Sequence, residues 1–311
     1  MTHSQHPPLI IILGPTASGK TKLAIALAEL YKGEIISADS RQVYRGMDIG
    51  TGKDLIEYGK TPYHLIDIIN PDQEYNLYQF SRDFKHCYTG ISQRATLPFL
   101  VGGTGMYLDA VLSRYNLTIA KTSENARNLY ANKPESELIS HLYKLKPELH
   151  NTTDTNDRSR LIQAISIAEA EKAHAETITW PNFKPFIMGI NINKKRCQAR
   201  ITQRLKDRIE EGMIEEVVKL KNNDIGWETL ENFGLEYRYI AQYLQGSLNY
   251  NDMFQKLNSA IHRFAKKQDK WFRKIENKGH DIHWLEADDQ LQVNAVKQLD
   301  IFMSQYKSIS K

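Results

Sequence analysis

The amino-acid sequence predicts an α/β fold, in which helices cover both faces of a parallel sheet and a helical insertion domain interrupts the core. Two observations carry this prediction. Across the first hundred residues, short apolar runs alternate with segments of helical character, as in buried parallel strands joined by helices. The first apolar run, residues 9–13, leads directly into a glycine-rich turn and then into a helical segment.

The glycine-rich turn reads Gly14-Pro15-Thr16-Ala17-Ser18-Gly19-Lys20-Thr21. It matches the pattern G-x-x-x-x-G-K-[ST] in the strand-turn-helix context where that pattern has a physical meaning. Successive backbone N–H groups can wrap a phosphate, Lys20 adds a positive charge, and the Thr21 hydroxyl can ligate Mg²⁺. The motif therefore predicts a P-loop NTPase-like core. By itself it suggests an ATP-binding enzyme, but it does not identify the molecule that carries the phosphate.

Further strands are predicted at residues 34–38, 63–69 and 98–101, the last of which runs into the glycine-rich segment 102–105. In an open parallel sheet, ligands collect at the carboxyl ends of the strands. The phosphate loop, Asp39 and residues 102–105 all follow strands. We therefore expect them to face one cleft.

The character of the sequence changes between residues 116 and 180, where strand signals vanish and leucines recur at helical spacing. We predict a helical insertion over 116–180, and a core made of residues 1–115 and 181–311. Residues 186–190 return as a strand, and the remainder reads as mostly helical. One apolar helix stripe is formed by Ile201, Leu205, Ile209 and Met213.

Composition describes an ordinary globular chain of 311 residues, with 41% hydrophobic and 25% charged residues. No apolar run approaches the length of a membrane span or a signal peptide core, so we expect a cytoplasmic protein with no membrane contact. Cys87 and Cys197 are the only cysteines, too few for a disulfide framework or a cysteine-based zinc site.

Positive charge is concentrated in two stretches, although the net charge of the whole chain is only +4. Residues 194–208 hold seven Lys or Arg against one Asp, and residues 263–274 hold six against one. In the second stretch the cations alternate with aromatic residues. These stretches are either two solvated helix faces or a surface that binds a polyanion such as nucleic acid.

Two kinds of residue could carry chemistry beside the phosphate loop. Asp39 at the end of a strand could orient Mg²⁺, accept a proton from a nucleophile, or merely cap the next helix. Arg200, Arg204 and Arg208 recur every four residues on one side of a predicted helix. Arg204 borders the apolar stripe, so it either reaches inward to pair with a departing diphosphate or lies exposed with its neighbours.

Taken together, these segments resemble the tRNA dimethylallyltransferase (tRNA isopentenyltransferase) family of bacterial type. The most specific segment is residues 43–51, Val-Tyr-Arg-Gly-Met-Asp-Ile-Gly-Thr. The resemblance extends in order from residue 9 to about residue 274. It includes residues 14–21, 39–53, 64–68, 100–107, Asn156-Asp157 with Arg160, residues 200–204, and residues 264–268 with 271–273.

The resemblance implies transfer of a dimethylallyl group from dimethylallyl diphosphate to N6 of the adenosine next to the anticodon, position 37 of tRNA. In that family the loop Gly14–Thr21 would hold the diphosphate of the donor. Thr16 and Lys20 would contact it, and Thr21 would place Mg²⁺. Asp39 would be the general base on N6, and Arg204 would hold the leaving diphosphate.

The resemblance also implies residues that contact tRNA, and the acceptor base would have to leave its stack. These residues are Ser40, Arg41, Gln42, Thr104, Arg160, Gln163 and Arg238. The insertion and the C-terminal basic helix would hold the anticodon stem-loop, and the enzyme is expected to be a monomer. Three positions depart from the usual family pattern: Glu236 stands where Gly is common, Gln163 where Arg is common, and His262 lies in an altered tripeptide.

Three other functions compete with this interpretation. An adenylate isopentenyltransferase performs the same chemistry on a free nucleotide, but such relatives are generally smaller and lack an extended tRNA-binding lobe. A P-loop small-molecule kinase would leave Asp39-Ser40 and residues 43–51 unexplained. A catalytically inert RNA-binding protein predicts a damaged phosphate loop or a missing Asp39, and neither is found.

Overall fold

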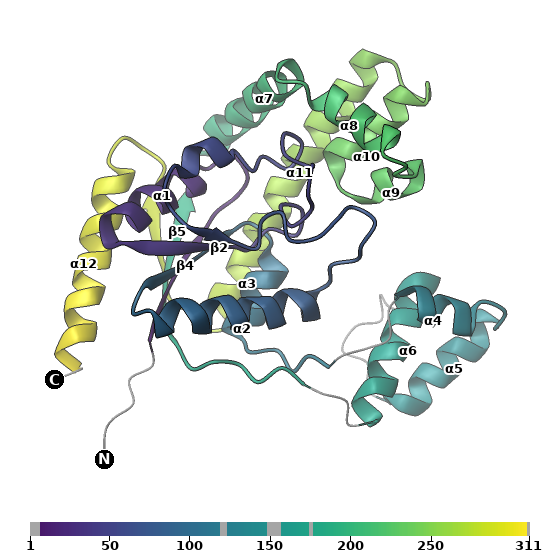
Figure 1. Cartoon of the computed structure of the whole chain (residues 1–311), viewed down its shortest axis with the longest axis horizontal. Coiled ribbons are helices and arrows are strands. Elements are labelled where there is room, and N and C mark those ends of the chain that lie inside the picture. The colour runs from purple at the N-terminus through teal and green to yellow at the C-terminus, as the bar shows by residue number, and fades with distance from the viewer. Residues whose placement is uncertain (1–6, 119–122, 148–156, 174–176, 310–311) are drawn as a thin grey trace. The chain divides into compact units, whose positions relative to one another are not determined.

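Six parallel strands form one sheet in the part of the chain that the computed structural model describes, residues 7–118, 123–147, 157–173 and 177–309 (Figure 1). The strand order is β3-β2-β4-β1-β5-β6. Central β1 places Ile11 beside Leu100 of β4 and Ile187 of β5. The predicted parallel α/β sheet is confirmed. The bounds are β1 (Pro8–Leu13), β2 (Gly33–Ser37), β3 (Tyr63–His64), β4 (Leu97–Gly102), β5 (Lys184–Asn191) and β6 (Ile282–Glu286).

The chain divides into two compact units. The sequence predicted a core and an insertion over residues 116–180. The first unit is Met1–Ser113 with Pro181–Lys311 and contains the sheet, and the second is Arg114–Trp180. No helix in the described ranges is both long enough and apolar enough to span a bilayer.

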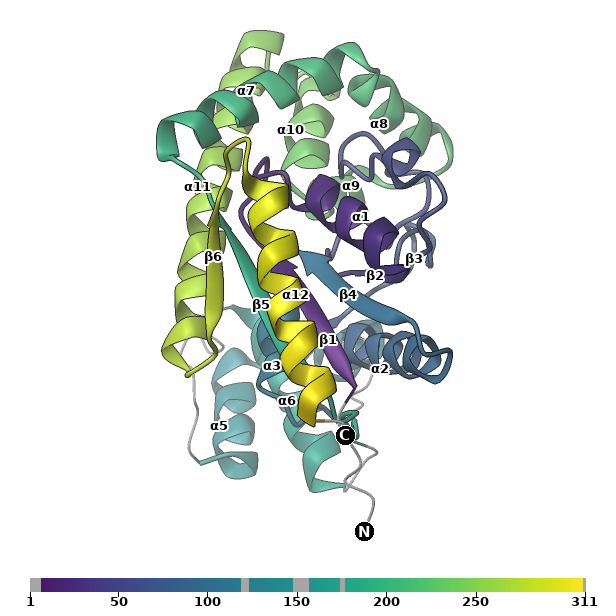
Figure 2. The same cartoon turned by 90° about the vertical axis from the view of Figure 1, so that its left-hand side faces the viewer.

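Helices cover both faces of the sheet in the first unit. On one face, Ile10 and Ile12 of β1 pack in one apolar cluster with Leu27 of α1 (Lys20–Tyr31) and Leu299 of α12 (Leu291–Ile309), which Figure 2 shows beside the strands. On the other face, α2 (Leu77–Gln93) contacts β2 and β4. Its Phe80 stacks on Tyr107 of α3 (Gly105–Leu112) with ring centroids 3.9 Å apart. Strands buried on both faces explain why their sequences are continuously apolar.

A layer of helices follows β5 and adds a second apolar cluster. Its members are α7 (Lys194–Glu210), α8 (Met213–Asn222), α9 (Trp227–Asn232), α10 (Leu235–Leu244) and α11 (Tyr250–Asn277). Val43, Tyr44 and Met47, from the segment after β2, are buried within this cluster. The segment that carries the most specific sequence motif is therefore packed between the sheet and the helical layer.

The second unit has its own small core. Its helices are α4 (Ser123–Tyr130), α5 (Glu135–Leu145) and α6 (Arg158–Lys172). Leu138 and Leu142 of α5 pack against Leu161 and Ile165 of α6, and all four side chains are buried. Helical leucine spacing predicted this packing. Asn156 of the family motif lies outside the described residues.

Three details of the sequence prediction were wrong. The strand predicted over residues 63–69 ends after His64, because Leu65 and Asp67 adopt positive φ values of 62° and 55°. Met213 does not continue the stripe of α7, since the chain turns at Gly212 and Met213 begins α8. Strand β6 was not anticipated, because its short sequence Ile-His-Trp-Leu-Glu is neither continuously apolar nor strictly alternating.

Candidate active site

The phosphate loop connects β1 to α1 as the sequence predicted. Gly19 has a φ of 95°, a left-handed conformation that glycine adopts without steric cost, and it stands immediately before the first turn of α1. Ala17 also has a positive φ, 62°. The Lys20 ammonium donates to the carbonyl of Pro15 at 3.4 Å. The loop thus curls over its own lysine at the N-terminus of a helix, where an anion is favoured.

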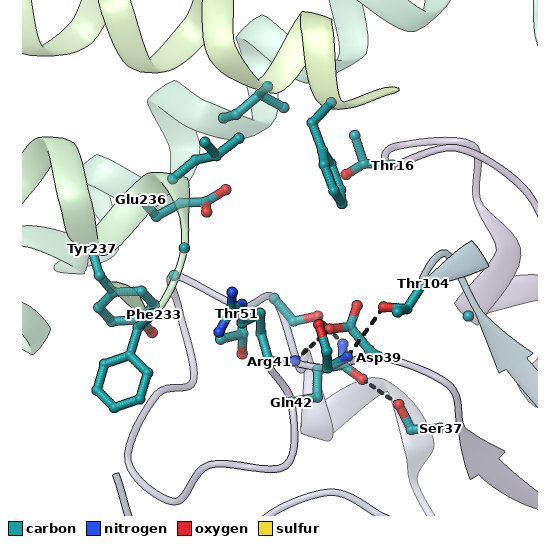
Figure 3. A pocket seen from close by; sticks show the side chains of 18 of the residues that line it. Thr16, Ser37, Asp39, Arg41, Gln42, Thr51, Thr104, Phe233, Glu236 and Tyr237 are labelled. Atoms are coloured by element: carbon teal, nitrogen blue, oxygen red, sulfur yellow. Dashed lines mark hydrogen bonds between the residues drawn. The ribbon is translucent and has the colours of Figure 1, made fainter. Parts of the chain in front are cut away.

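A cavity of about 340 Å³ opens above this loop at the carboxyl ends of the strands. Its lining brings together most of the residues that the sequence singled out, from three strand ends and from the helical layer (Figure 3). These are Thr16, Lys20, Thr21, Asp39, Ser40, Arg41, Gln42, Thr104, Arg204 and Arg238. The expectation of one shared cleft is met. Its volume lies in the ordinary range for small-molecule sites.

Arg160 and Gln163 belong to α6 in the second unit, and neither is among the described residues that line this cavity. The Arg160 side chain is exposed, and its backbone N–H donates to Asp157 at the start of α6. Of the remaining loop residues, Gly14, Pro15 and Ser18 are buried, and Ala17 lines a smaller recess beside the cavity. Their part in any site is to shape the loop.

Gln268 joins the phosphate loop to the loop after β4. Its side-chain oxygen accepts a hydrogen bond from the Thr16 N–H at 2.8 Å, and its amide nitrogen donates to the Gly103 carbonyl at 3.0 Å. The side chain is only 5% exposed. Because the backbone N–H of Thr16 is already used, the threonine side chain is the part left to meet a ligand. The sequence singled out Gln268 as the end of the family-like segment 264–268, without giving it this role.

Asp39 lies on the floor of the cavity beyond the end of β2. Its Oδ1 accepts a hydrogen bond from the backbone N–H of Arg41 at 2.9 Å, and no hydrogen bond among the described residues uses Oδ2. The neighbouring Ser40 N–H donates to Thr104 Oγ1 at 3.2 Å. No helix follows Asp39 directly, so it does not act as a helix cap. This turn fixes the carboxylate while leaving one oxygen free for chemistry.

Gln42 is one residue whose expected contact with tRNA the geometry makes difficult. Its side-chain oxygen accepts from the Ser37 hydroxyl at 2.9 Å, and its amide donates to the Gly52 carbonyl at 3.1 Å. Its side chain is 9% exposed. Gln42 therefore braces the wall of the cavity, and a contact with RNA would cost one of these bonds.

The wall formed by residues 43–53 is organised by Lys53, which is completely buried. Its ammonium donates to the Tyr44 carbonyl at 2.7 Å, to Asp48 Oδ1 at 2.6 Å and to Asp67 Oδ1. All three donor positions of the ammonium are thereby satisfied, as a buried charge requires.

Glu216 of α8 binds the same segment, residues 43–53, through backbone N–H groups. Its carboxylate accepts from the backbone N–H groups of Asp48, Ile49 and Gly50 at 2.7, 2.8 and 3.0 Å, and from the Tyr237 hydroxyl at 2.7 Å. Lys53 stood out in the sequence only as part of the family-like segment 39–53, and Glu216 did not stand out at all, because its partners are backbone groups and a hydroxyl far away in the sequence.

Five cations line the cavity: Lys20, Arg41, Arg204, Arg208 and Arg238. Arg204 pairs with Asp54 at 2.7 Å. Burial, and after it the charge of Arg204, lowers the pKa of Lys20 to about 8, while Asp39 opposes the shift. Burial and Arg204 lower the pKa of Arg208 to about 10. Gly52, at a φ of 63°, makes room for this group, since a Cβ there would lie 1.4 Å from Arg208 Nη2. Arg204 and Arg208 are thus partly buried at the cavity wall rather than fully exposed.

Glu236 is the one carboxylate in the cavity wall that the predicted chemistry does not use. Burial raises its pKa, and the positive charge of Arg208 opposes that rise. Figure 3 shows its side chain directed into the open space of the cavity, across from Thr16. In the sequence this position attracted notice only as a departure from a family pattern.

Two family models match the chain. The model described as IPP transferase matches residues 42–275, and the one described as isopentenyl transferase matches residues 7–59. The chain is 54% identical over 280 residues to tRNA dimethylallyltransferase 1 of Geotalea uraniireducens, with 90% of this chain and 93% of that relative covered. It is 51% identical to tRNA dimethylallyltransferase 2 of Citrifermentans bemidjiense, with 96% and 97% covered.

Solved structures agree with these matches. The full-length tRNA isopentenylpyrophosphate transferase of Bacillus halodurans superposes with a TM-score of 0.70 at 30% identity, covering 97% of each chain. A eukaryotic dimethylallyltransferase acting on tRNA has a TM-score of 0.78 at 23% identity, covering 98% of this chain and 80% of its own, and shows a shared fold.

Replacing Lys53 by Met should destabilise the protein by about 2–4 kcal/mol, because Met fills the space but leaves Tyr44 O and two carboxylates without their donor. Urea unfolding followed by circular dichroism measures this loss. Lys60→Met is the matched control, since Lys60 is exposed in the same region. If both variants lose less than about 1 kcal/mol, Lys53 does not organise the wall.

Binding of inorganic diphosphate should weaken as the pH rises above about 8. The lowered pKa of Lys20 means that the free protein loses this positive charge there, whereas a bound anion favours the protonated amine. Affinity should fall up to tenfold per pH unit in that range. Calorimetric titration between pH 7 and 9.5 tests this. The Lys20→Arg variant keeps its positive charge in the same buffers, so its affinity for diphosphate should fall less with rising pH. If its affinity falls as steeply as that of the parent protein, deprotonation of Lys20 is not the cause.

Proposed function

The chain belongs to the IPP transferase family, and from this premise we propose that it transfers a dimethylallyl group from dimethylallyl diphosphate to N6 of adenosine 37 in tRNA. The observation that carries the proposal is the convergence of the phosphate loop, Asp39 and Arg204 on one cavity. The family membership rests on a model that spans residues 42–275. We further propose that the enzyme acts as a monomer in the cytoplasm.

The donor would lie with its diphosphate on the phosphate loop. The Thr16 hydroxyl, Lys20 and Arg204 face this end of the cavity, and the guanidinium of Arg204 is already held by Asp54. Departure of diphosphate concentrates negative charge on its oxygens. Preorganised cations stabilise that charge most effectively in a cavity partly shielded from water. The apolar side chains of Ile201, Leu205 and Ile261 border the adjacent recess, whose volume of about 20 Å³ is too small to hold a five-carbon chain.

Asp39 would act as the general base. The N6 amine of adenine is a poor nucleophile, because its lone pair is delocalised into the ring. As the N6–C1 bond forms and the C1–O bond to diphosphate breaks, a proton leaves N6 for the Asp39 carboxylate. The turn from Asp39 to the Arg41 N–H holds one oxygen in place and leaves the other available.

Mg²⁺ fits the residues that are present. Thr21 lines the cavity in the first turn of α1, and its hydroxyl is the hard oxygen ligand that Mg²⁺ takes alongside substrate phosphates. When bound, Mg²⁺ would neutralise part of the diphosphate charge and so assist its departure.

The acceptor would enter the same cavity as a base turned out of the anticodon loop. Ser40, Arg41, Thr104 and Arg238 line the cavity, and α11 carries an exposed basic face beside it at Arg263, Lys266, Lys267, Lys270, Arg273 and Lys274. Clustered cations of this kind bind phosphate backbones. The second unit, with Arg160 and Gln163, would supply further contacts to the stem-loop.

A side-by-side acceptor assay tests the proposed function. The full chain is incubated with Mg²⁺ and labelled dimethylallyl diphosphate, and is offered either AMP or an anticodon stem-loop RNA containing adenosine 37. We expect label in the RNA alone. Label in AMP alone would indicate an adenylate isopentenyltransferase. ATP turnover without dependence on dimethylallyl diphosphate would indicate a kinase.

Asp39→Asn should lower kcat for prenyl transfer by about 10²–10⁴-fold, because Asn preserves the turn to Arg41 but cannot accept the proton. Asp39→Ala should lose both the turn to Arg41 and the proton acceptor, so its kcat should be no higher than that of Asp39→Asn. Binding of the stem-loop RNA, measured by filter retention, should be largely unchanged in both variants. Asp72→Asn, on an exposed loop, serves as the control. Near-normal turnover of Asp39→Asn would exclude Asp39 as the base.

Arg204→Ala should lower kcat/KM for dimethylallyl diphosphate on the order of 10²–10³-fold, because it removes a preorganised cation from the leaving group. Steady-state kinetics with saturating RNA measures the loss. Lys206→Ala removes an exposed cation from the same helix and should change little. Equal rates for the two variants would make Arg204 a surface residue without a role in transfer.

A further inference from the structure

Glu236 is a carboxylate in the donor cavity with no role in the proposed transfer. It lies in the first turn of α10, two residues after Gly234, whose φ is 150°. It lines both the main cavity and the recess beside the phosphate loop. Figure 3 shows it facing the cavity across from Thr16, whereas Phe233 and Tyr237 are turned away from that space. A carboxylate partly withdrawn from bulk water here needs a physical reason.

The charged groups that face Glu236 come from every element around it. From α7 these are Arg204 and Arg208, and from the segment after β2 they are Asp39 and Arg41. Its neighbours in α10 are Tyr237 and Arg238. Among the described residues no hydrogen bond or ion pair joins its carboxylate to another side chain, so the cations act on it across the cavity. Of these charges, that of Arg208 acts most strongly.

Five cations line the cavity, and three of them, Lys20, Arg204 and Arg208, are each opposed by a carboxylate. Asp54 pairs directly with Arg204, Asp39 acts on Lys20, and Glu236 acts on Arg208, for which no ion pair is found within the described residues. Like charges so close together would otherwise repel one another in a weakly solvated space. These carboxylates offset part of the positive charge of the empty cavity, and an entering diphosphate changes that balance.

We propose that Glu236 is the counter-anion of the Arg208 guanidinium in the free enzyme, and that it takes up a proton from solvent when diphosphate binds beside Arg204 and Arg208. This rests on the proposed function, because it assumes that the cavity receives a diphosphate. The proton binds a carboxylate oxygen, and no other bond changes. When diphosphate leaves, the proton returns to solvent and the carboxylate again opposes Arg208.

The direction of this coupling follows from the charges. Burial already raises the pKa of Glu236, and Arg208 holds the rise in check. Bound diphosphate cancels the effect of Arg208 and adds repulsion of its own, so both effects raise the pKa of Glu236 further in the complex. A group whose pKa is higher in the complex strengthens binding at low pH, and this advantage is lost as the pH rises from the free to the complexed pKa.

Calorimetric titration of inorganic diphosphate with Mg²⁺ into the full chain tests the coupling. Each variant is titrated between pH 5 and pH 8 in two buffers of different ionisation enthalpy, which yields the number of protons taken up. Glu236→Gln mimics the protonated carboxyl at every pH. Glu236→Asp keeps a titrating carboxyl, and Glu228→Gln removes an exposed carboxylate from the neighbouring helix α9.

We expect Glu236→Gln to take up fewer protons than the parent protein, by as much as one per diphosphate. It should bind diphosphate more tightly than the parent at pH 8, by roughly tenfold for each pKa unit between free and bound Glu236. The two affinities should converge at pH 5. Glu236→Asp should retain part of the extra proton uptake, and Glu228→Gln should behave like the parent.

Two results would overturn the proposal. Equal proton uptake in the parent and in Glu236→Gln, or an affinity ratio that is the same at every pH, would show a static structural role for Glu236. In that case diphosphate still binds, and the proposed function stands. If the parent protein binds no diphosphate under any of these conditions, the donor site of the proposed function fails together with the proposal for Glu236.

Discussion

The buried ammonium of Lys53 is the interaction on which the shape of the cavity depends. It gathers the Tyr44 carbonyl and the carboxylates of Asp48 and Asp67 around one point, and Glu216 holds the adjacent N–H groups from the other side. This fixes Gly52, which leaves no room for a Cβ beside the Arg208 guanidinium. Lys53 thus sets the position of Arg208 on α7, because it fixes the backbone of Gly52 against the Arg208 guanidinium.

The charges of the cavity follow from that arrangement. A cluster of cations in a weakly solvated space is unfavourable in the absence of a ligand, and the lowered pKa values of Lys20 and Arg208 express that cost. Carboxylates around the rim reduce it. The same cluster stabilises a polyanion strongly, because its cations are already oriented when the ligand arrives. The cavity thus trades some stability of the free protein for electrostatic preorganisation, as expected of a site where diphosphate is released.

The parts of the fold and site that sequence could predict are those encoded locally. The phosphate loop and Asp39 follow buried strands, and parallel topology brings strand ends to one edge. Interactions between residues far apart in the sequence could not be predicted. The strand predicted to begin at residue 63 ends early, and Asp67 instead accepts a hydrogen bond from Lys53, which lies 14 positions before it in the sequence. Glu216 meets backbone groups 166–168 positions away, and Gln268 bonds Thr16 across 252 positions. Such pairings leave no periodic pattern in one sequence.

Gln268 shows how one distant side chain can join two parts of a reaction site. The oxygen of its side-chain amide accepts a hydrogen bond from the phosphate loop, and the nitrogen donates one to the loop after β4. Both hydrogen bonds are shielded from water. Gln268 belongs to α11, whose exposed side carries the basic residues Lys266, Lys267 and Lys270. Gln268 therefore ties the helix that carries this basic face to the phosphate loop through a single side-chain amide.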